Sequence, residues 1–104
     1  MKILYNVTVI VDPIIEQDWL AWMQETHIPD VMNTGSFESY QLQKVITEGS
    51  EGGTSYAIQY LSPNMDTLDH YQSHHAPRLQ EAHNKRYSGK FGAFRTIMEV
   101  ISRG

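Results

Sequence analysis

Alternating apolar and polar residues predict four β-strands in this chain. The clearest is residues 3–11, where every second side chain is apolar and lies on one predicted buried face: Ile3, Tyr5, Val7, Val9 and Val11. Weaker alternation predicts strands in residues 37–46, 54–61 and 91–101. In the third of these four strands, the predicted core face carries Tyr56, Ile58 and Tyr60.

Between the strands, apolar residues recur at helical spacing in two segments. The first segment follows Asp12, a predicted helix cap, and its apolar stripe includes Trp19 and Trp22. The second segment begins with either Ser62 or Asn64 as its cap. The chain is therefore predicted to alternate strand, helix, strand, strand, helix, strand.

A motif of the form His-x-Pro-x-aliphatic occurs once in each helical segment, at residues 27–31 and 75–79. A residue that precedes proline disfavours the helical conformation, so we expect the first helix to break at His27 and Ile28 and the second at Pro77. The repeated motif suggests that one βαβ unit is used twice.

Two βαβ units joined by a hairpin predict an α+β fold of the ferredoxin-like βαββαβ type. Its four-stranded antiparallel sheet carries both helices on one face, within a single domain over residues 1–104. The glycine-rich residues 47–53 are predicted to form the hairpin loop.

The other face of this sheet is predicted to be too apolar for a comfortable solvent surface. It would expose Leu4, Asn6, Thr8, Ile10, Gln41, Ala57, Gln59, Arg95 and Ile97. A homodimer that closes one sheet against its copy is the simplest arrangement that buries such a face. The alternative is a monomer with a mixed surface.

Composition narrows the classes of function. The 104 residues carry a net charge of −4 without a basic cluster, which argues against nucleic acid as a partner. No cysteine is present, so a disulfide or a thiolate metal site is excluded. The sequence shows no apolar run long enough to span a membrane and no signal-peptide pattern, so we expect a cytoplasmic protein without a membrane partner.

The five histidines are the main candidates for chemistry. Asp66, His70 and His74 have a chelating spacing, but they lie on the predicted solvent face of their helix, so we predict no metal site. His27 and His75 would lie at the ends of antiparallel helices, roughly 20 Å apart, and so could not act as one pair. Each of them would instead cap its own helix end.

The predicted catalytic candidates are His75, His83 and Arg78. Histidine is the usual acid or base at neutral pH, and arginine can hold a carboxylate through two hydrogen bonds. A pocket between helices and sheet would complete the predicted ligand-binding set: Trp19, Trp22, His27, Tyr56, Tyr60, His75, Arg78 and His83. The alternative is that these aromatic side chains are only core. Fingerprints for nucleotide cofactors and nucleophile motifs are missing, so no cofactor is expected.

Several motifs spread over nearly the whole chain resemble a family of short bacterial proteins of unknown function. They are Tyr5-Asn6-Val7-Thr8-Val9, Trp19-x-x-Trp22-Met23, His27-Ile28-Pro29-Asp30-Val31-Met32, Thr34-Gly35-x-Phe37, Gln59-Tyr60, His75-Ala76-Pro77-Arg78-Leu79 with His83, and Ala93-Phe94-Arg95-Thr96. The resemblance implies a dimeric α+β barrel, similar to small monooxygenases and isomerases, and implies no particular activity.

Three functions remain open from the sequence. The first is a homodimeric binding or regulatory module for a small molecule, which we favour. The second is a cofactor-independent monooxygenase or isomerase that acts on a small aromatic or carboxylate substrate. The third is a protein whose role is dimerisation or interaction alone. An enclosed cavity beside His75 or His83 would favour the first two, and a shifted imidazole pKa inside it would favour the enzyme.

Overall fold

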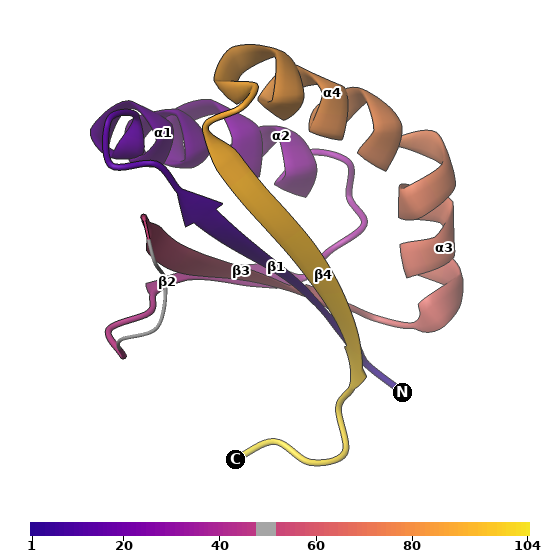
Figure 1. Ribbon diagram of the computed structural model, residues 1–104. Helices are drawn as coiled ribbons and strands as arrows, with labels where there is room; N and C mark the ends of the chain where they lie inside the picture. Colours follow the sequence, from indigo (N-terminus) through magenta and orange to yellow (C-terminus); the bar gives the residue numbers. More distant parts are fainter. Residues whose placement is uncertain (48–51) are drawn as a thin grey trace.

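The computed structural model describes residues 1–47 and 52–104 (Figure 1). Four strands form one antiparallel sheet in the order β2-β3-β1-β4. The strands are β1 (Ile3–Val11), β2 (Ser39–Lys44), β3 (Thr54–Ser62) and β4 (Phe91–Glu99). Most of the predicted hairpin loop, residues 48–51, lies outside the described residues. The antiparallel pairing of β2 with β3 that this loop would join is confirmed.

The helical segments all cover one face of the sheet (Figure 1), so the predicted ferredoxin-like α+β fold is confirmed. They are α1 (Glu16–Trp22), the π-helix η1 (Met23–His27), α2 (Ile28–Met32), α3 (Met65–His74) and α4 (Ala76–Tyr87). None of the helices within the described residues is long and apolar enough to cross a membrane.

The first helical segment differs from the prediction at both its start and its break. Asp12 caps a turn rather than α1, since its carboxylate accepts a hydrogen bond from the Ile14 amide at 2.9 Å. Ile28 keeps helical dihedral angles, φ −63° and ψ −44°, although Pro29 follows it. The wider π-helical turn ends at His27, and Pro29 lies at the start of α2, where a missing N–H group is tolerated.

The second helical segment agrees with the prediction in its cap, whereas its break lies two residues before the predicted position, Pro77, which instead falls in the first turn of α4. Asn64 is the cap of α3, with its side-chain oxygen accepting a hydrogen bond from the Thr67 amide at 2.8 Å. The helix breaks at His75, whose φ of −122° is not helical, and α4 continues to Tyr87.

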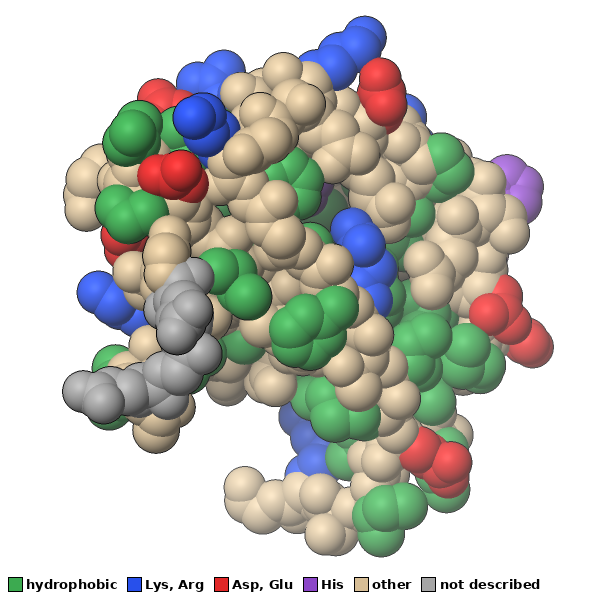
Figure 2. Space-filling model, viewed as in Figure 1, with side chains coloured by type: hydrophobic (Ala, Val, Ile, Leu, Met, Phe, Trp, Pro, Cys, Tyr) green, Lys and Arg blue, Asp and Glu red, His purple; other side chains and the backbone are tan. Residues whose placement is uncertain are grey.

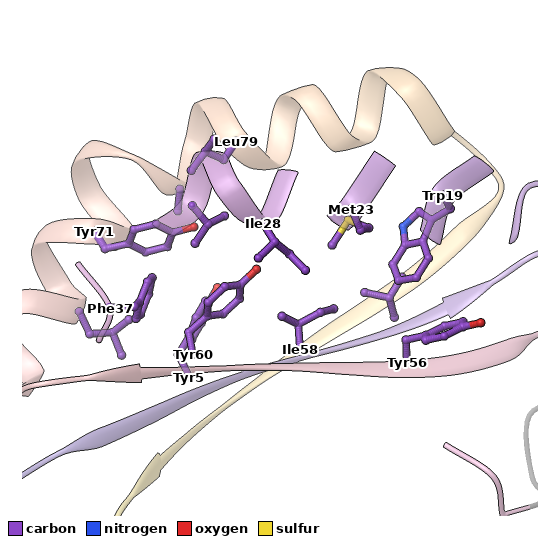
Figure 3. Packing of buried hydrophobic residues seen from close by; sticks show 14 of the residues in the cluster. Tyr5, Trp19, Met23, Ile28, Phe37, Tyr56, Ile58, Tyr60, Tyr71 and Leu79 are labelled. Carbon is purple, nitrogen blue, oxygen red and sulfur yellow. The ribbon is translucent and has the colours of Figure 1, made fainter. Parts of the chain in front are cut away.

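The core lies between the helices and the sheet (Figure 3). Trp19, Leu68 and Val11 are completely buried. The odd-numbered residues of β1 face this core, as predicted, although Val7 is only partly buried. At one end of the core, four aromatic rings with centroids 4.8 to 6.3 Å apart form a cluster of Tyr5, Phe37, Tyr60 and Tyr71.

The prediction for β4 placed its residues on the wrong faces of the sheet. Arg95 pairs with Val7 across the sheet, and directly opposed residues share a face, so Arg95 and Ile97 lie on the helix side. Phe94 and Met98 instead lie on the open face. The alternation could not distinguish the two faces because β4 is an edge strand with apolar residues on both of them.

In β2, Tyr40 pairs with the core residue Tyr60 and so lies on the helix side of the sheet, yet 47% of its surface is exposed. Ile46, in the same predicted strand, is 90% exposed. The strand lies at the other edge of the sheet, and it ends at Lys44, before Ile46.

Candidate ligand-binding site

A cavity lies between the helices and the sheet, on the side where β4 forms the edge. The cavity has a volume of about 50 Å³. Figure 2 shows the surface hollowed between α4 and β4, with a basic side chain at the edge of the hollow. The sheet contributes an apolar floor that includes Val7, Val9 and Ile58, while polar groups come from both layers.

Two histidines, one from each helical segment, meet at this cavity. His27 ends the π-helix η1 and His83 lies on α4, and their ring centroids are 5.7 Å apart. His83 is buried, and its Nε2 accepts a hydrogen bond from Nε1–H of Trp19 at 2.8 Å. The indole N–H can only donate, so neutral His83 must carry its proton on Nδ1.

Both imidazoles are neutral at pH 7. Burial lowers the pKa of His27 to about 4; the nearby Asp30 opposes this shift and the charge of Arg95 adds to it. Burial also lowers the pKa of His83 to about 4, with further contributions from His27 and Arg95. Burial disfavours the charged form of an imidazole, so these two groups are available as a proton acceptor or as neutral hydrogen-bond partners.

Arg95 supplies the only charge at neutral pH among the described residues that line this cavity. Burial raises the pKa of the Tyr5 hydroxyl, and the nearby charge of Arg95 opposes this shift. The hydroxyl-bearing rings of Tyr60 and Tyr71 also line the cavity. Burial raises the pKa of all three tyrosines, which keeps their hydroxyls protonated. The cavity therefore combines one cation with several neutral hydrogen-bonding groups.

His75 and Arg78 are not part of this cavity. The Arg78 guanidinium contacts Nδ1 of His75 at 2.8 Å, and both residues line a surface groove with Asp30 and Asn33 at the end of α2. The structure thus does not bring His75 and Arg78 together with His83, and a functional role for them stays a prediction.

The predicted separation of His27 and His75 at opposite ends of antiparallel helices also differs from the structure. His75 is the junction between α3 and α4, not the end of the helical segment, and α4 runs twelve residues further. This junction lies beside the end of α2. His27 meets His83 instead, because His83 lies two turns beyond the junction.

Three of the four aromatic residues predicted to line the site lie behind it. Tyr60 lines the cavity itself. Trp19 packs on Tyr56 with ring centroids 5.0 Å apart, and Trp22 packs on His27 at 5.1 Å. The tryptophans therefore support the histidines rather than forming the cavity wall.

A polar cluster holds α4 against α1 next to these rings. The hydroxyl of Tyr87 donates a hydrogen bond to Asp18 at 2.8 Å and accepts one from Nε of Arg86 at 3.0 Å. The Arg86 guanidinium also lies over the Trp22 ring, 5.6 Å from its centroid. These contacts hold α4, which carries His83, against α1, which leads directly into the π-helical turn that ends at His27.

Sequence reasoning missed Arg95, Tyr5 and Tyr71 as site residues. The alternation of β1 accounts for the buried ring of Tyr5, and the helical spacing of apolar residues accounts for the ring of Tyr71. Neither pattern indicates a role for the hydroxyl group. Arg95 pairs with Val7 and therefore lies on the helix side of the sheet. A cation on that side needs polar partners, so the correct register of β4 would have identified Arg95 as a site candidate.

Among the residues that the structure describes, no three histidine, aspartate or glutamate side chains lie close enough together to hold a metal ion. His70 and His74 stack with ring centroids 4.0 Å apart on the exposed side of α3.

The sequence matches the family described as a domain of unknown function, DUF4286, over residues 2–101, and the chain therefore belongs to that family. No curated protein matches it significantly.

Solved structures with similar folds include three informative examples. One is a dimeric ferredoxin-like protein from an uncultured marine organism, with 8% identity, a TM-score of 0.70 and coverage of 99% of this chain and 98% of that chain. A protein of the ethyl tert-butyl ether D family from Bacillus halodurans C-125 has 9% identity, a TM-score of 0.69 and coverage of 94% and 99%. SnoaB, a cofactor-independent oxygenase from Streptomyces nogalater, has 12% identity, a TM-score of 0.64 and coverage of 98% and 95%. At these identities the likeness shows the fold alone.

The two lowered imidazole pKa values predict a loss of stability in mild acid. The unfolded chain takes up protons near the ordinary pKa of 6.5, whereas folded His27 and His83 do so only near 4. The unfolded state therefore binds more protons between these values. Their contribution to stability is intact above about pH 6.5, falls as the pH is lowered, and is fully lost below about pH 4. Each imidazole contributes at most about 1.4 kcal/mol per pH unit.

Urea unfolding measured at several pH values between neutrality and mild acid checks this prediction. The double variant His27→Gln/His83→Gln should show a shallower pH dependence than the wild type, whereas His70→Gln/His74→Gln on the exposed face should not. Equal slopes in the wild type and the first variant would contradict the prediction.

Proposed function

We propose that this protein binds a small organic acid in the cavity between its helices and its sheet. Arg95 carries this proposal, because it is the one cation among the described lining residues and none of those residues is acidic. The surrounding imidazoles are neutral, so Arg95 is the one lining group that attracts an anion through its charge. A negatively charged ligand would supply the counter-charge that the site lacks.

The size of the cavity limits how the ligand is held. The cavity of about 50 Å³ has room for a few water molecules or a small functional group. This volume is well below the usual range for small-molecule sites, so most of a larger ligand has to lie outside the cavity. We therefore expect the acid group inside, near Arg95, and the apolar part of the ligand along the mouth.

Replacement of the cation should abolish selectivity for acids. Arg95→Gln is expected to weaken binding of benzoate by about 10- to 100-fold, because it removes a charge-assisted hydrogen bond worth roughly 1.5–3 kcal/mol. Trp22 packs on His27, so tryptophan fluorescence can follow the titration. Benzamide provides the neutral ligand, and Arg103→Gln, in the exposed C-terminal segment, provides the matched control. Equal affinity for benzoate and benzamide would contradict the proposal.

A second candidate function is proton abstraction from the bound acid. The position of His27 favours it, because this imidazole lines the same cavity as Arg95 and is unprotonated at neutral pH, although its lowered pKa makes it a weaker base than a free imidazole. His27 would take a proton from a C–H group beside a carbonyl, and the electron pair of that bond would form an enolate near Arg95. Return of the proton to another carbon would complete an isomerisation, whereas an oxygenase would need dioxygen as a second substrate.

The exchange of deuterium into phenylpyruvate tests this candidate. In heavy water the wild type should accelerate exchange at the carbon beside the carbonyl, and His27→Gln should lower the rate by about 10²- to 10⁴-fold. His75→Gln tests the residue that sequence analysis favoured and should leave the rate unchanged. A rate that depends on His75 rather than His27 would place the chemistry outside this cavity.

We also propose that the protein forms a homodimer through its open sheet face. Phe94 and Met98 lie there with 56% and 37% of their surfaces exposed, opposite Thr8 and Leu4 on β1. Hydrophobic side chains are visible along β4 in Figure 2. The similar fold of the marine ferredoxin-like protein, which is dimeric, supports the same arrangement. Burial of this face in a second copy would remove an exposed apolar surface from water.

Light scattering tests the dimer. The wild type should have twice the 12.0 kDa mass of the chain, and Phe94→Asp should shift it towards the monomer, since a charge would then be buried at the interface. Ile14→Asp is the matched control, because Ile14 is 82% exposed in the turn before α1, away from the sheet. Retention of the dimer by a folded Phe94→Asp variant would contradict this interface.

A further inference from the structure

The aromatic end of the cavity contains a group of hydroxyls that packing alone does not require. Tyr5, Tyr60 and Tyr71 all line the cavity. The ring of Tyr5 lies 6.3 Å from that of Tyr60 and 6.1 Å from that of Tyr71. Figure 3 shows the phenol oxygens of the three side chains directed towards the same space beside Ile28. Phenylalanine would fill the same volume without placing polar oxygens in an apolar core.

These hydroxyls and Arg95 can act together as hydrogen-bond donors. A guanidinium can only donate hydrogen bonds, and Arg95 lines the same cavity as Tyr5, whose O–H stays protonated because burial raises its pKa. Burial keeps Tyr60 and Tyr71 protonated, so they also have O–H groups to offer. Neither hydroxyl has a side-chain hydrogen-bond partner among the described residues.

The two ends of the cavity therefore differ in chemistry. Tyr5, Tyr60 and Tyr71 supply O–H donors at one end, and His27 and His83 form the other end. The charge of Arg95 acts on both ends, since it affects the pKa of both histidines and of Tyr5 and Tyr71. Nε2 of His83 already accepts a hydrogen bond from Trp19, so His27 is the imidazole with a free acceptor. An oxygen that bears negative charge fits the first end, and an exchangeable proton fits the second.

We propose that Tyr5, Tyr71 and Arg95 form a subsite for the charged oxygen of a carboxylate, a phenolate or an enolate. This subsite rests on the proposed function and deepens it, because it fixes the orientation of the ligand. The oxyanion lies at the tyrosine end, and the carbon or oxygen that exchanges a proton faces His27. Tyr71 is then a specificity-determining residue that favours the ionised form of the ligand over the neutral form.

Binding of 4-nitrophenol tests the subsite directly, since its absorbance distinguishes the phenolate from the phenol. The wild type should bind the phenolate and lower the apparent pKa of the bound probe by about one unit or more, which equals a tenfold preference for the anion. Tyr71→Phe and Tyr5→Phe should each reduce that shift while the aromatic packing is kept. Tyr40→Phe, at the exposed edge strand, is the matched control.

The outcomes separate this inference from the proposed function. If benzoate binding depends on Arg95 but the tyrosine variants leave both the affinity and the pKa of the bound probe unchanged, the subsite is wrong and the acid-binding site stands. If neither benzoate nor 4-nitrophenol binds to the folded wild type, both proposals fail. Binding of the protonated phenol would also overturn the subsite. Thermal unfolding of each variant confirms that a lost shift does not reflect a lost fold.

Discussion

The hydrogen bond between the Trp19 indole and the His83 imidazole is the constraint on which the site depends. It joins α1 to α4 above the sheet, and both partners are buried, so loss of either would leave a polar group without a partner in the core. The same bond fixes the tautomer of His83 and opposes its protonation, because a protonated imidazole has no lone pair to accept the indole proton. Trp19 thus influences the protonation state of a residue that lines the cavity, although Trp19 itself lies outside the cavity.

The electrostatic balance of the site follows from that constraint. Two imidazoles held neutral leave Arg95, an exposed residue of β4, as the single positive charge at a cavity with an apolar floor. Protonation of either histidine would add a second positive charge at short range, which is unfavourable at low dielectric. An anion relieves this imbalance, which is the physical reason to favour acids over neutral or basic ligands.

Much of the fold could be predicted from the sequence because its strongest signals are local. The strict alternation in β1, the Asn64 cap and the helix break at His75 depend on neighbouring residues alone. The site could be predicted only in part. His27, His83 and Tyr60 line the cavity, but Arg95 was assigned to the opposite face, because the faces of an edge strand are set by its pairing with β1. The pairing of His27 with His83 likewise depends on how far α4 continues beyond the break at His75.

The π-helical turn η1 has a consequence for how the site tolerates insertions and deletions. A π-turn holds one residue more than an α-turn, and each residue of a helix turns the chain by about 100°. Removal of one residue from Met23–His27 would restore a regular α-helix and leave Trp19, which precedes the deletion, in the core. The side chains that follow the deletion would then be rotated about the helix axis by about 100°. The helix could survive such a deletion, whereas the pairing of His27 with His83 could not. The number of residues in this turn therefore determines where the imidazole of His27 lies relative to that of His83.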